Sequence, residues 1–204
     1  MDLLMPHLLP HPLCNAATYR DLAAGQKLFQ QGDPAVALFM VKTGRLKVVR
    51  HIDRHKMTTL QVARPNDTMG EAALFSSVHF CAAVAEITSQ VIVYPKQALF
   101  AALRQYPGLA ETLMVLMVKK IQSLKLLLEL RDVRTAHERV LRYLSYLAQP
   151  GDPRVVSFDR PLKDIAGELG LTPETLSRAL SRLEQEGAIT RQQYLITVHD
   201  NPAA

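Results

Sequence analysis

Residues 162–186 read LKDIAGELGLTPETLSRALSRLEQE, and this stretch decides the fold. Its first half has an apolar stripe at helical spacing that ends at a glycine stop, formed by Leu162, Ile165, Ala166, Leu169 and then Gly170. Thr172 suits the N-cap of a second helix. Pro173 suits its first position, because an N–H there would have no partner. The stretch therefore predicts two short helices joined by a tight turn.

The second predicted helix has a buried face and a separate polar face. Its apolar stripe consists of Leu176, Leu180 and Leu183. Its polar face carries Glu174, Ser177 and Arg178, with Arg182 one turn later. This pattern is typical of a helix-turn-helix, whose second helix enters the major groove of DNA. The alternating segments 188–191 and 194–198 predict the two strands of a wing.

Residues 172–189, TPETLSRALSRLEQEGAI, resemble the recognition helix of the cyclic-AMP receptor protein / fumarate-nitrate regulator superfamily of bacterial transcription factors. The Glu174, Ser177, Arg178 pattern is similar to the fumarate-nitrate and dissimilatory nitrate-respiration branch. Residues 136–148, AHERVLRYLSYLA, are similar to the nitrate-respiration regulators at the same place. The resemblance covers almost all of residues 20–198.

The chain upstream of this stretch alternates short apolar runs with Gly, Pro and Asn turn signals between Tyr19 and Val93. That texture predicts an antiparallel barrel or jelly roll, and it resembles the cyclic-nucleotide-binding β-roll. The expected fold class is α+β, with a sensor β-roll, a dimerisation helix with a hinge, and a winged helix-turn-helix. The expected domains are residues 1–107, 108–134 and 135–204.

Composition permits a DNA-binding role without demanding it. The 204 residues are 48% hydrophobic and carry a net charge of +5. However, residues 135–204 hold 8 Lys and Arg against 9 Asp and Glu, so the DNA-binding segment is not basic overall. We therefore expect affinity for double-stranded DNA to come from local placement of Arg178, Arg182 and Arg191, doubled by dimerisation.

Two cysteines provide no disulfide framework, and no apolar run approaches the length of a membrane span. The sequence therefore predicts a cytoplasmic protein with no membrane association. His7, His11 and Cys14 have the spacing of metal ligands, but Pro10 and Pro12 interrupt them. We expect these prolines to prevent a regular helix, and we expect no metal site.

The effector region begins at Gly70 and Glu71, which resemble the start of the phosphate-binding cassette of the β-roll. In nucleotide-binding members an arginine follows about ten residues later and neutralises the cyclic phosphate. Here Cys81 takes that place and Ala82 follows. A buried phosphate without a cation is costly, so a cyclic nucleotide is not the expected effector.

Haem is another effector that the resemblance implies, because nitrate-respiration regulators are associated with haem and nitric oxide sensing. His79, beside Cys81, would supply an axial ligand. The alternative reading makes His79 a loop residue and Cys81 a small hydrophobe at the start of a strand. An iron–sulfur cluster of the four-cysteine type is excluded, since the chain has only two cysteines.

The longest helical pattern runs from Leu109 to about Val133 and carries two apolar stripes. The first has coiled-coil spacing and predicts a homodimer interface formed by Met114, Met117, Ile121, Leu124 and Leu128. The second could pack on the β-roll and comprises Leu113, Leu116, Leu127 and Leu130. A buried core helix of a monomer would also fit. We expect a hinge at residues 131–135.

These features predict a homodimeric transcription regulator that reads an inverted repeat. Arg178 is expected to contact guanine, Glu174 a cytosine amine and Ser177 a neighbouring base. Phosphate contacts are expected from Thr172, Thr175 and Arg182. The resemblance implies TTGAT-like half-sites and RNA polymerase as a partner.

Other functions stay open at this point. Glu174 and Arg178 could form a plain surface ion pair, and the winged helix could bind a protein partner instead of DNA. A cupin-type metalloenzyme would need His-x-His spacing with a matching Glu, which His51, His55 and His79 lack. We therefore do not expect an enzyme.

Overall fold

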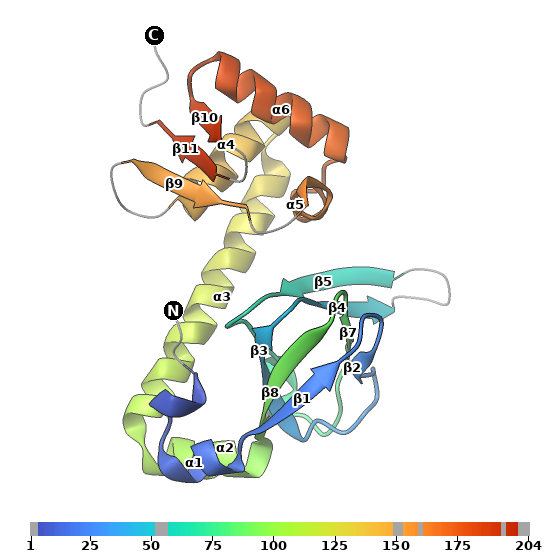
Figure 1. Cartoon of the computed structure of the whole chain (residues 1–204), viewed down its shortest axis with the longest axis vertical. Coiled ribbons are helices and arrows are strands. Elements are labelled where there is room, and N and C mark those ends of the chain that lie inside the picture. Colours follow the sequence, from blue (N-terminus) through green and yellow to red (C-terminus); the bar gives the residue numbers. More distant parts are fainter. Residues whose placement is uncertain (1–3, 52–56, 149–152, 159–160, 193–194, 200–204) are drawn as a thin grey trace. The chain divides into compact units, whose positions relative to one another are not determined.

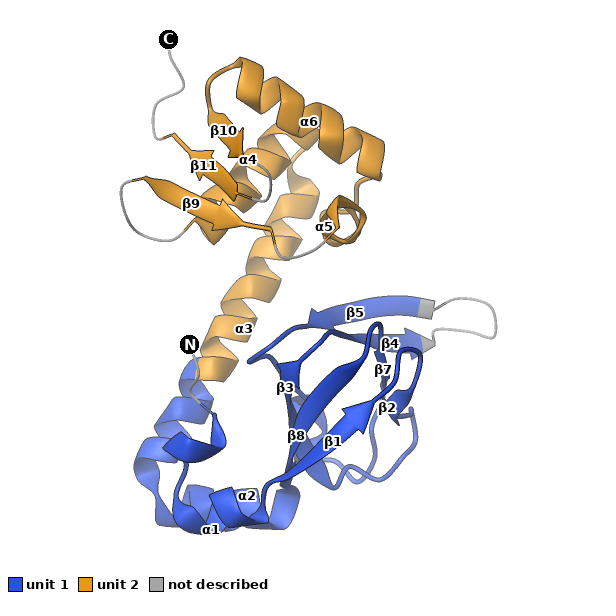
Figure 2. Ribbon diagram, viewed as in Figure 1, with its two compact units in different colours: residues 1–115 blue, residues 116–204 orange. Residues whose placement is uncertain are grey.

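The structure is a computed structural model that describes residues 4–51, 57–148, 153–158, 161–192 and 195–199 (Figure 1). The chain forms two compact units, Met1–Val115 and Leu116–Ala204 (Figure 2). Helix α3 (Pro107–Asp132) begins in the first unit and ends in the second. None of the described helices has the length and apolar character needed to cross a membrane.

The first unit is a β-roll of antiparallel strands. Its strands are β1 (Thr18–Leu22), β2 (Lys27–Phe29), β3 (Ala37–Thr43), β4 (Leu46–His51), β5 (Met57–Ala63), β6 (Thr68–Met69), β7 (Ala82–Ala85) and β8 (Ser89–Pro95). One sheet has the strand order β1-β8-β3-β6, and the other has the order β2-β7-β4-β5. Residues 52–56, between β4 and β5, lie outside the described residues.

The core of the roll lies between these two sheets. Small and branched side chains from both sheets form one buried cluster, which includes Val41 and Val91 from one sheet and Leu46 and Ala83 from the other. Side chains that alternate across a pleated strand fill such an interior from both sides. The short helix η2 (Glu71–Ala73) interrupts the second half of the roll between β6 and β7.

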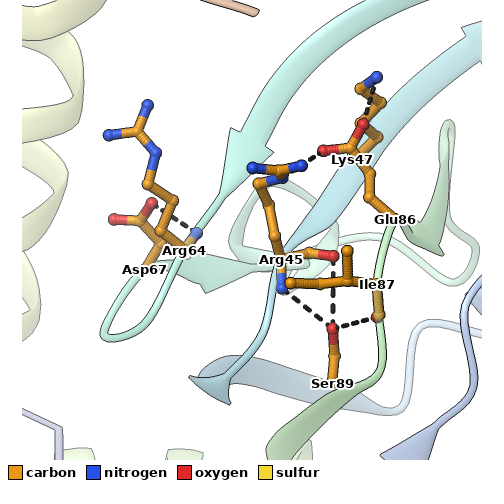
Figure 3. Close-up of polar contacts among 7 residues, drawn as sticks. All are labelled: Arg45, Lys47, Arg64, Asp67, Glu86, Ile87 and Ser89. Carbon is orange, nitrogen blue, oxygen red and sulfur yellow. Dashed lines mark hydrogen bonds and ion pairs between the residues drawn. The ribbon is translucent and has the colours of Figure 1, made fainter. Parts of the chain in front are cut away.

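A polar cluster holds the β3–β4 turn against the start of β8 (Figure 3). Ser89 is buried, accepts a hydrogen bond from the backbone N–H of Arg45 at 3.0 Å, and donates to the carbonyl of Ile87 at 2.7 Å. The guanidinium of Arg45 contacts Glu86 at 2.6 Å, and Lys47 pairs with the other oxygen of that carboxylate. The turn is therefore fixed to the start of β8 through Ser89 and to the preceding β7–β8 connection through Glu86.

The N-terminal segment contains two short helices, η1 (Pro6–Leu8) and α1 (His11–Ala16). Leu9 and Pro10 between them have extended backbone, so no continuous helix carries both His7 and His11. Pro12 lies in the first turn of α1, where its missing N–H removes no helical bond. Tyr94 of β8 donates its hydroxyl to the carbonyl of Leu4, and this bond ties the segment to the roll.

Helix α2 (Lys96–Gln105) packs on β3 and β8 and leads into α3. The last part of α3 belongs to the core of the second unit, where Leu130 is buried and Leu127 packs against that cluster. The prediction that these two leucines would pack on the β-roll was therefore wrong. A stripe on a long helix does not by itself identify its partner.

The second unit is a winged helix-turn-helix. Its elements are α4 (Ala136–Leu147), β9 (Arg154–Ser157), α5 (Leu162–Glu168), α6 (Pro173–Gln185), β10 (Ile189–Gln192) and β11 (Leu195–Val198). The strands form a sheet in the order β10-β11-β9. This confirms the predicted α+β architecture, in which a β-roll is followed by a long helix and a winged helix-turn-helix.

Candidate functional site

Helix α6 begins as its sequence predicts. The hydroxyl of Thr172 accepts a hydrogen bond from the backbone N–H of Thr175 at 3.2 Å, and Pro173 occupies the first turn. Gly170, in the turn before it, has a φ of +64°, which ends α5 in the left-handed conformation. The left-handed Gly170 and the Thr172 cap therefore fix where α5 ends and where α6 begins.

Burial divides α6 into the two predicted faces. The buried face carries Leu176, Ala179, Leu180 and Leu183, which join the core of the second unit. Glu174, Ser177 and Arg178 are exposed on the first turns of the helix. An amphipathic helix with such a polar N-terminal face is the arrangement that reads the major groove.

Glu174 is an ionised hydrogen-bond acceptor on this face. Its pKa is lowered, first because its own backbone N–H stabilises the carboxylate, then by the Thr172 hydroxyl and the charge of Arg178. Among the described residues Arg178 forms no ion pair, and its nearest hydrogen-bond partner is the Thr175 hydroxyl at 3.4 Å. Its guanidinium therefore has donors available for another molecule.

The other two arginines that the sequence singled out are already paired. Arg182 lies 2.8 Å from the carboxylate of Glu186. Arg191 of β10 donates two hydrogen bonds to Glu184, at 2.8 and 2.6 Å. Glu186 and Glu184 neutralise these two arginines. A count of the basic residues in the sequence therefore overstates the positive charge that the motif offers to DNA.

Arg191 ties the wing to helix α6. Besides its guanidinium bonds, its backbone N–H donates to Glu184 at 3.1 Å, and one of its guanidinium nitrogens also donates to Ser181. Sequence analysis missed this role, because Glu184 and Arg191 lie in different elements. The tip of the wing, residues 193–194, lies outside the described residues.

The candidate effector residues lie close together at one place in the β-roll. Gly70 has a φ of +85°, and a β-carbon there would lie 3.5 Å from the ring of His79. Cys81 is near enough to Glu71 and Arg50 for their charges to act on its thiol, and Ala82 is buried at the start of β7. Residues 70–82 therefore fold so that Gly70 lies near His79 and Glu71 lies near Cys81.

His79 is buried in the roll and is only 2% exposed. Its ring stacks on Phe29 with a centroid distance of 3.9 Å, and Phe39 lies beyond, at 6.2 Å. Its Nδ1 atom is buried and has no hydrogen-bond partner among the described residues. The reading of His79 as an ordinary loop residue therefore misses its buried aromatic environment, which comes from Phe29 and Phe39 on strands 40 to 50 residues earlier in the chain.

Burial governs the protonation of this site. Desolvation lowers the pKa of His79, with a smaller opposing effect of Asp33 and a reinforcing effect of Lys96. Burial and the charge of Glu71 raise the pKa of the Cys81 thiol, against the opposing effect of Arg50. Both side chains are therefore neutral near pH 7. Neither supplies the cation that a cyclic phosphate would need.

The lowered pKa of His79 predicts that acid destabilises the roll. Above about pH 6.5, the pKa of an unfolded histidine, the ring is neutral in both states. As the pH falls below that value, the unfolded chain binds a proton more readily than the folded one, so the free energy of unfolding falls. We expect denaturant unfolding between about pH 7 and pH 5 to show a steeper fall for wild type than for His79→Phe. Equal slopes would contradict this assignment.

The predicted dimer residues of α3 form an uncovered apolar stripe. Met114 is 58% exposed and Leu124 is 56% exposed, Ile121 and Leu128 are similarly exposed, and Met117 is half-buried. Val118 and Val115 widen the stripe. A contiguous exposed apolar face of this kind marks an interaction surface.

The structure gives the position of His7, His11 and Cys14, the residues with metal-ligand spacing. Within the described parts of the chain, no three His, Cys, Asp or Glu side chains come together as metal ligands. His7 and His11 are exposed on η1 and α1, and Cys14 is half-buried.

Comparisons with known proteins agree with this architecture. The family model for the cyclic nucleotide-binding domain matches residues 19–106, and that for the Crp-like helix-turn-helix domain matches residues 138–203. The chain is 28% identical over 187 residues to the transcriptional activator protein anr of Pseudomonas aeruginosa, covering 89% of this chain and 77% of that protein. It is 29% identical over 191 residues to the fumarate and nitrate reduction regulatory protein of Escherichia coli K12, covering 90% and 76%.

A solved structure shows the same fold. FixK2 from Bradyrhizobium japonicum superposes with a TM-score of 0.68 at 24% identity, covering 90% of this chain and 93% of that one. The two family models occupy the β-roll and the winged helix-turn-helix, and the relatives are transcription regulators, not enzymes. The chain therefore belongs to the cyclic-AMP receptor protein / fumarate-nitrate regulator superfamily of DNA-binding transcription regulators, with its relatives on the fumarate-nitrate side.

Proposed function

We propose that the protein is a homodimeric regulator that binds an inverted repeat of TTGAT-like half-sites under the control of an effector in the β-roll. The observation that carries this proposal is the exposed face of α6, where Glu174, Ser177 and Arg178 project from the first turns of a capped helix. The uncovered stripe on α3 supports the two-fold arrangement that an inverted repeat requires.

Each residue of this face has a proposed role. Arg178 donates to guanine O6 and N7, Glu174 accepts from a cytosine amine, and Ser177 contacts a neighbouring base. Thr172, Thr175 and Arg182 contact phosphates, with Arg182 exchanging its bond to Glu186 for one to DNA. RNA polymerase is the proposed protein partner, by resemblance to the family. We retain residues 1–107, 108–134 and 135–204 as the proposed domains.

Arg178→Ala tests the direct readout. We expect the variant to lose discrimination at one guanine of the half-site, because a good bidentate contact contributes about 1–3 kcal/mol of discrimination. Fluorescence anisotropy with the TTGAT inverted repeat and its single-base variants measures the effect. Arg182→Ala is the matched control, and we expect it to weaken all sequences alike and to lower the salt slope by about one.

The outcomes separate the proposed roles. If Arg178→Ala weakened binding to every sequence equally, Arg178 would be a phosphate contact and the assignment would be wrong. If the wild-type protein bound the inverted repeat no more tightly than a scrambled duplex, the proposed site itself would be wrong. Sequence-independent binding would instead favour the protein-partner alternative.

We propose that the effector is not a cyclic nucleotide. The neutral Cys81 thiol and the Ala82 methyl group offer no charge and only a weak S–H donor to a phosphate at the place where nucleotide-binding members have an arginine. Titration with cyclic AMP and cyclic GMP, followed by thermal unfolding, tests this, since a ligand that binds the folded state raises its stability.

Haem fits the described residues poorly. Because the ring of His79 is 2% exposed and stacked on Phe29, a porphyrin could reach its nitrogens only by displacing the neighbouring aromatic side chains. The visible absorption spectrum with and without added haemin, in wild type and His79→Ala, tests this directly. A sharp Soret band that His79→Ala removed would make the protein a haem-based sensor.

A further inference from the structure

One arginine of α4 binds the ends of two other helices. Arg139 donates one hydrogen bond to the carbonyl of Val133 at 2.7 Å and another to the carbonyl of Leu169 at 3.0 Å. Val133 directly follows the last residue of α3, and Leu169 is the C-cap of α5, in the turn of the helix-turn-helix. A single side chain therefore connects the end of the dimerisation helix to the DNA-binding motif.

The physical chemistry of helix ends suits this arrangement. The last carbonyls of a helix have no partner within the helix, and they lie at the negative end of its dipole. A guanidinium is always charged and offers several donors in a rigid, planar fork, so it can satisfy two such carbonyls at a fixed separation. Arg139 is half-buried, where solvent screens these bonds less than on an open surface.

The first turn of α4 holds the motif at a second point. The Nε2 atom of His137 lies 2.6 Å from the carboxylate of Glu186, the C-cap residue of α6. Thr135 caps α4 itself by accepting from the backbone N–H of Glu138 at 3.2 Å. The C-terminal ends of both helices of the motif are thus tied to the first turns of α4, which follows α3.

We propose that Arg139 is a positioning residue that sets the orientation of α6 relative to the end of α3. It lies on a helix that precedes the motif and acts through the two carbonyls, not through DNA. This inference rests on the homodimeric function proposed above. In a dimer, the two α6 helices must enter major grooves about one helical turn apart, so their orientation relative to α3 decides whether both half-sites bind together.

The consequence distinguishes positioning from a plain structural role. Loss of the Arg139 bonds between the end of α3 and the turn of the helix-turn-helix leaves each α6 able to bind one half-site. It lowers the gain from binding two half-sites at once, because that gain depends on geometry that permits simultaneous contact. A residue that only stabilised the domain would affect single and paired half-sites equally.

The experiment compares Arg139→Met and Arg139→Lys with a matched control, Arg142→Met. Arg142 is an exposed arginine on the same helix. It forms an ion pair with Glu138 of α4 at 2.6 Å, and this pair lies within a single helix. Anisotropy titrations use the TTGAT inverted repeat, a duplex with one half-site, and inverted repeats with the spacer changed by about one base pair. Sedimentation and thermal unfolding of each variant accompany them.

We expect Arg139→Met to bind the inverted repeat about tenfold more weakly while its affinity for the single half-site stays within about twofold of wild type. Its preference for one spacer length should also fall. Arg139→Lys keeps the charge but lacks the fork, so an intermediate loss is expected. Arg142→Met should behave as wild type.

Three results would overturn the inference. An equal loss on the single half-site and the inverted repeat would make Arg139 a stabilising residue only. Unchanged binding of the inverted repeat by Arg139→Met would remove any role in positioning. A wild-type protein that bound the inverted repeat no more tightly than one half-site would contradict the homodimeric function, and this inference with it.

Discussion

Replacing Leu124 with glutamate is expected to convert the protein to a monomer and to weaken its binding to the inverted repeat by at least about 100-fold. Leu124 is 56% exposed and lies on the same stripe of α3 as Ile121 and Leu128. In a two-fold dimer the new carboxylate meets its own copy in an apolar interface, where burial and like-charge repulsion both oppose association. Sedimentation and anisotropy titrations measure the two effects.

A matched control distinguishes the effect of a charge on the apolar stripe from the effect of a charge elsewhere on α3. Gln122 is exposed on α3, and Gln122→Glu adds the same charge off the predicted seam. We expect this control to remain dimeric and to bind DNA with nearly wild-type affinity. A Leu124→Glu protein that stayed dimeric would show that the stripe is not the dimer interface, and the monomeric core-helix alternative would then need another partner for it.

Gly44→Ala is expected to destabilise the β-roll by about 3 kcal/mol or more, combining left-handed strain with overpacking. Gly44 lies in the β3–β4 turn with a φ of +88°, and a β-carbon there would lie 2.6 Å from the backbone Cα of Ser89. Ser89 cannot withdraw freely, because its hydroxyl bonds the backbone of Arg45 and Ile87 (Figure 3). Chemical denaturation measures the loss.

Gly25→Ala provides the control for strain alone. Gly25 has a φ of +81°, but a β-carbon there would meet nothing within 4 Å. Its substitution should therefore cost only about 1 kcal/mol, from the backbone conformation. If both variants lost the same stability, the close approach of Gly44 to Ser89 would have no energetic importance, and the turn would be less rigid than its contacts indicate.

The helix-turn-helix was predictable because its signals are local. Thr172, Pro173 and Gly170 act within one turn of the residues they cap or stop, and the structure shows each of them in that role. The apolar stripes of α5 and α6 follow the helical period, and their residues are buried except Leu162 at the start of α5, which is exposed. Helix propensity, caps and periodicity all indicate the same elements here.

The β-roll was predictable as a class but not in its contacts. Short strands between turn residues indicated a jelly roll, and the family resemblance indicated the cyclic-nucleotide-binding β-roll in particular. The stacking of His79 on Phe29 and the closeness of Gly70 to His79 depend on how β2, β3 and the residue 70–82 segment come together. No spacing in the sequence records a contact between residues 50 positions apart, because strand pairing in a closed roll is set by the whole sheet.

By itself, the sequence determined the order of the roll, the long helix and the DNA-binding motif, together with the exposed Glu174, Ser177 and Arg178 face, because caps and periodicity act between near neighbours in the chain. Only the tertiary structure decided which arginines of the DNA-binding motif are already paired with carboxylates. It paired Arg182 with Glu186 and Arg191 with Glu184, turned Leu127 and Leu130 of α3 toward the second unit, and placed Arg139 between two helix ends. Ion pairs and packing depend on side-chain positions in space, which the packing of separate elements sets.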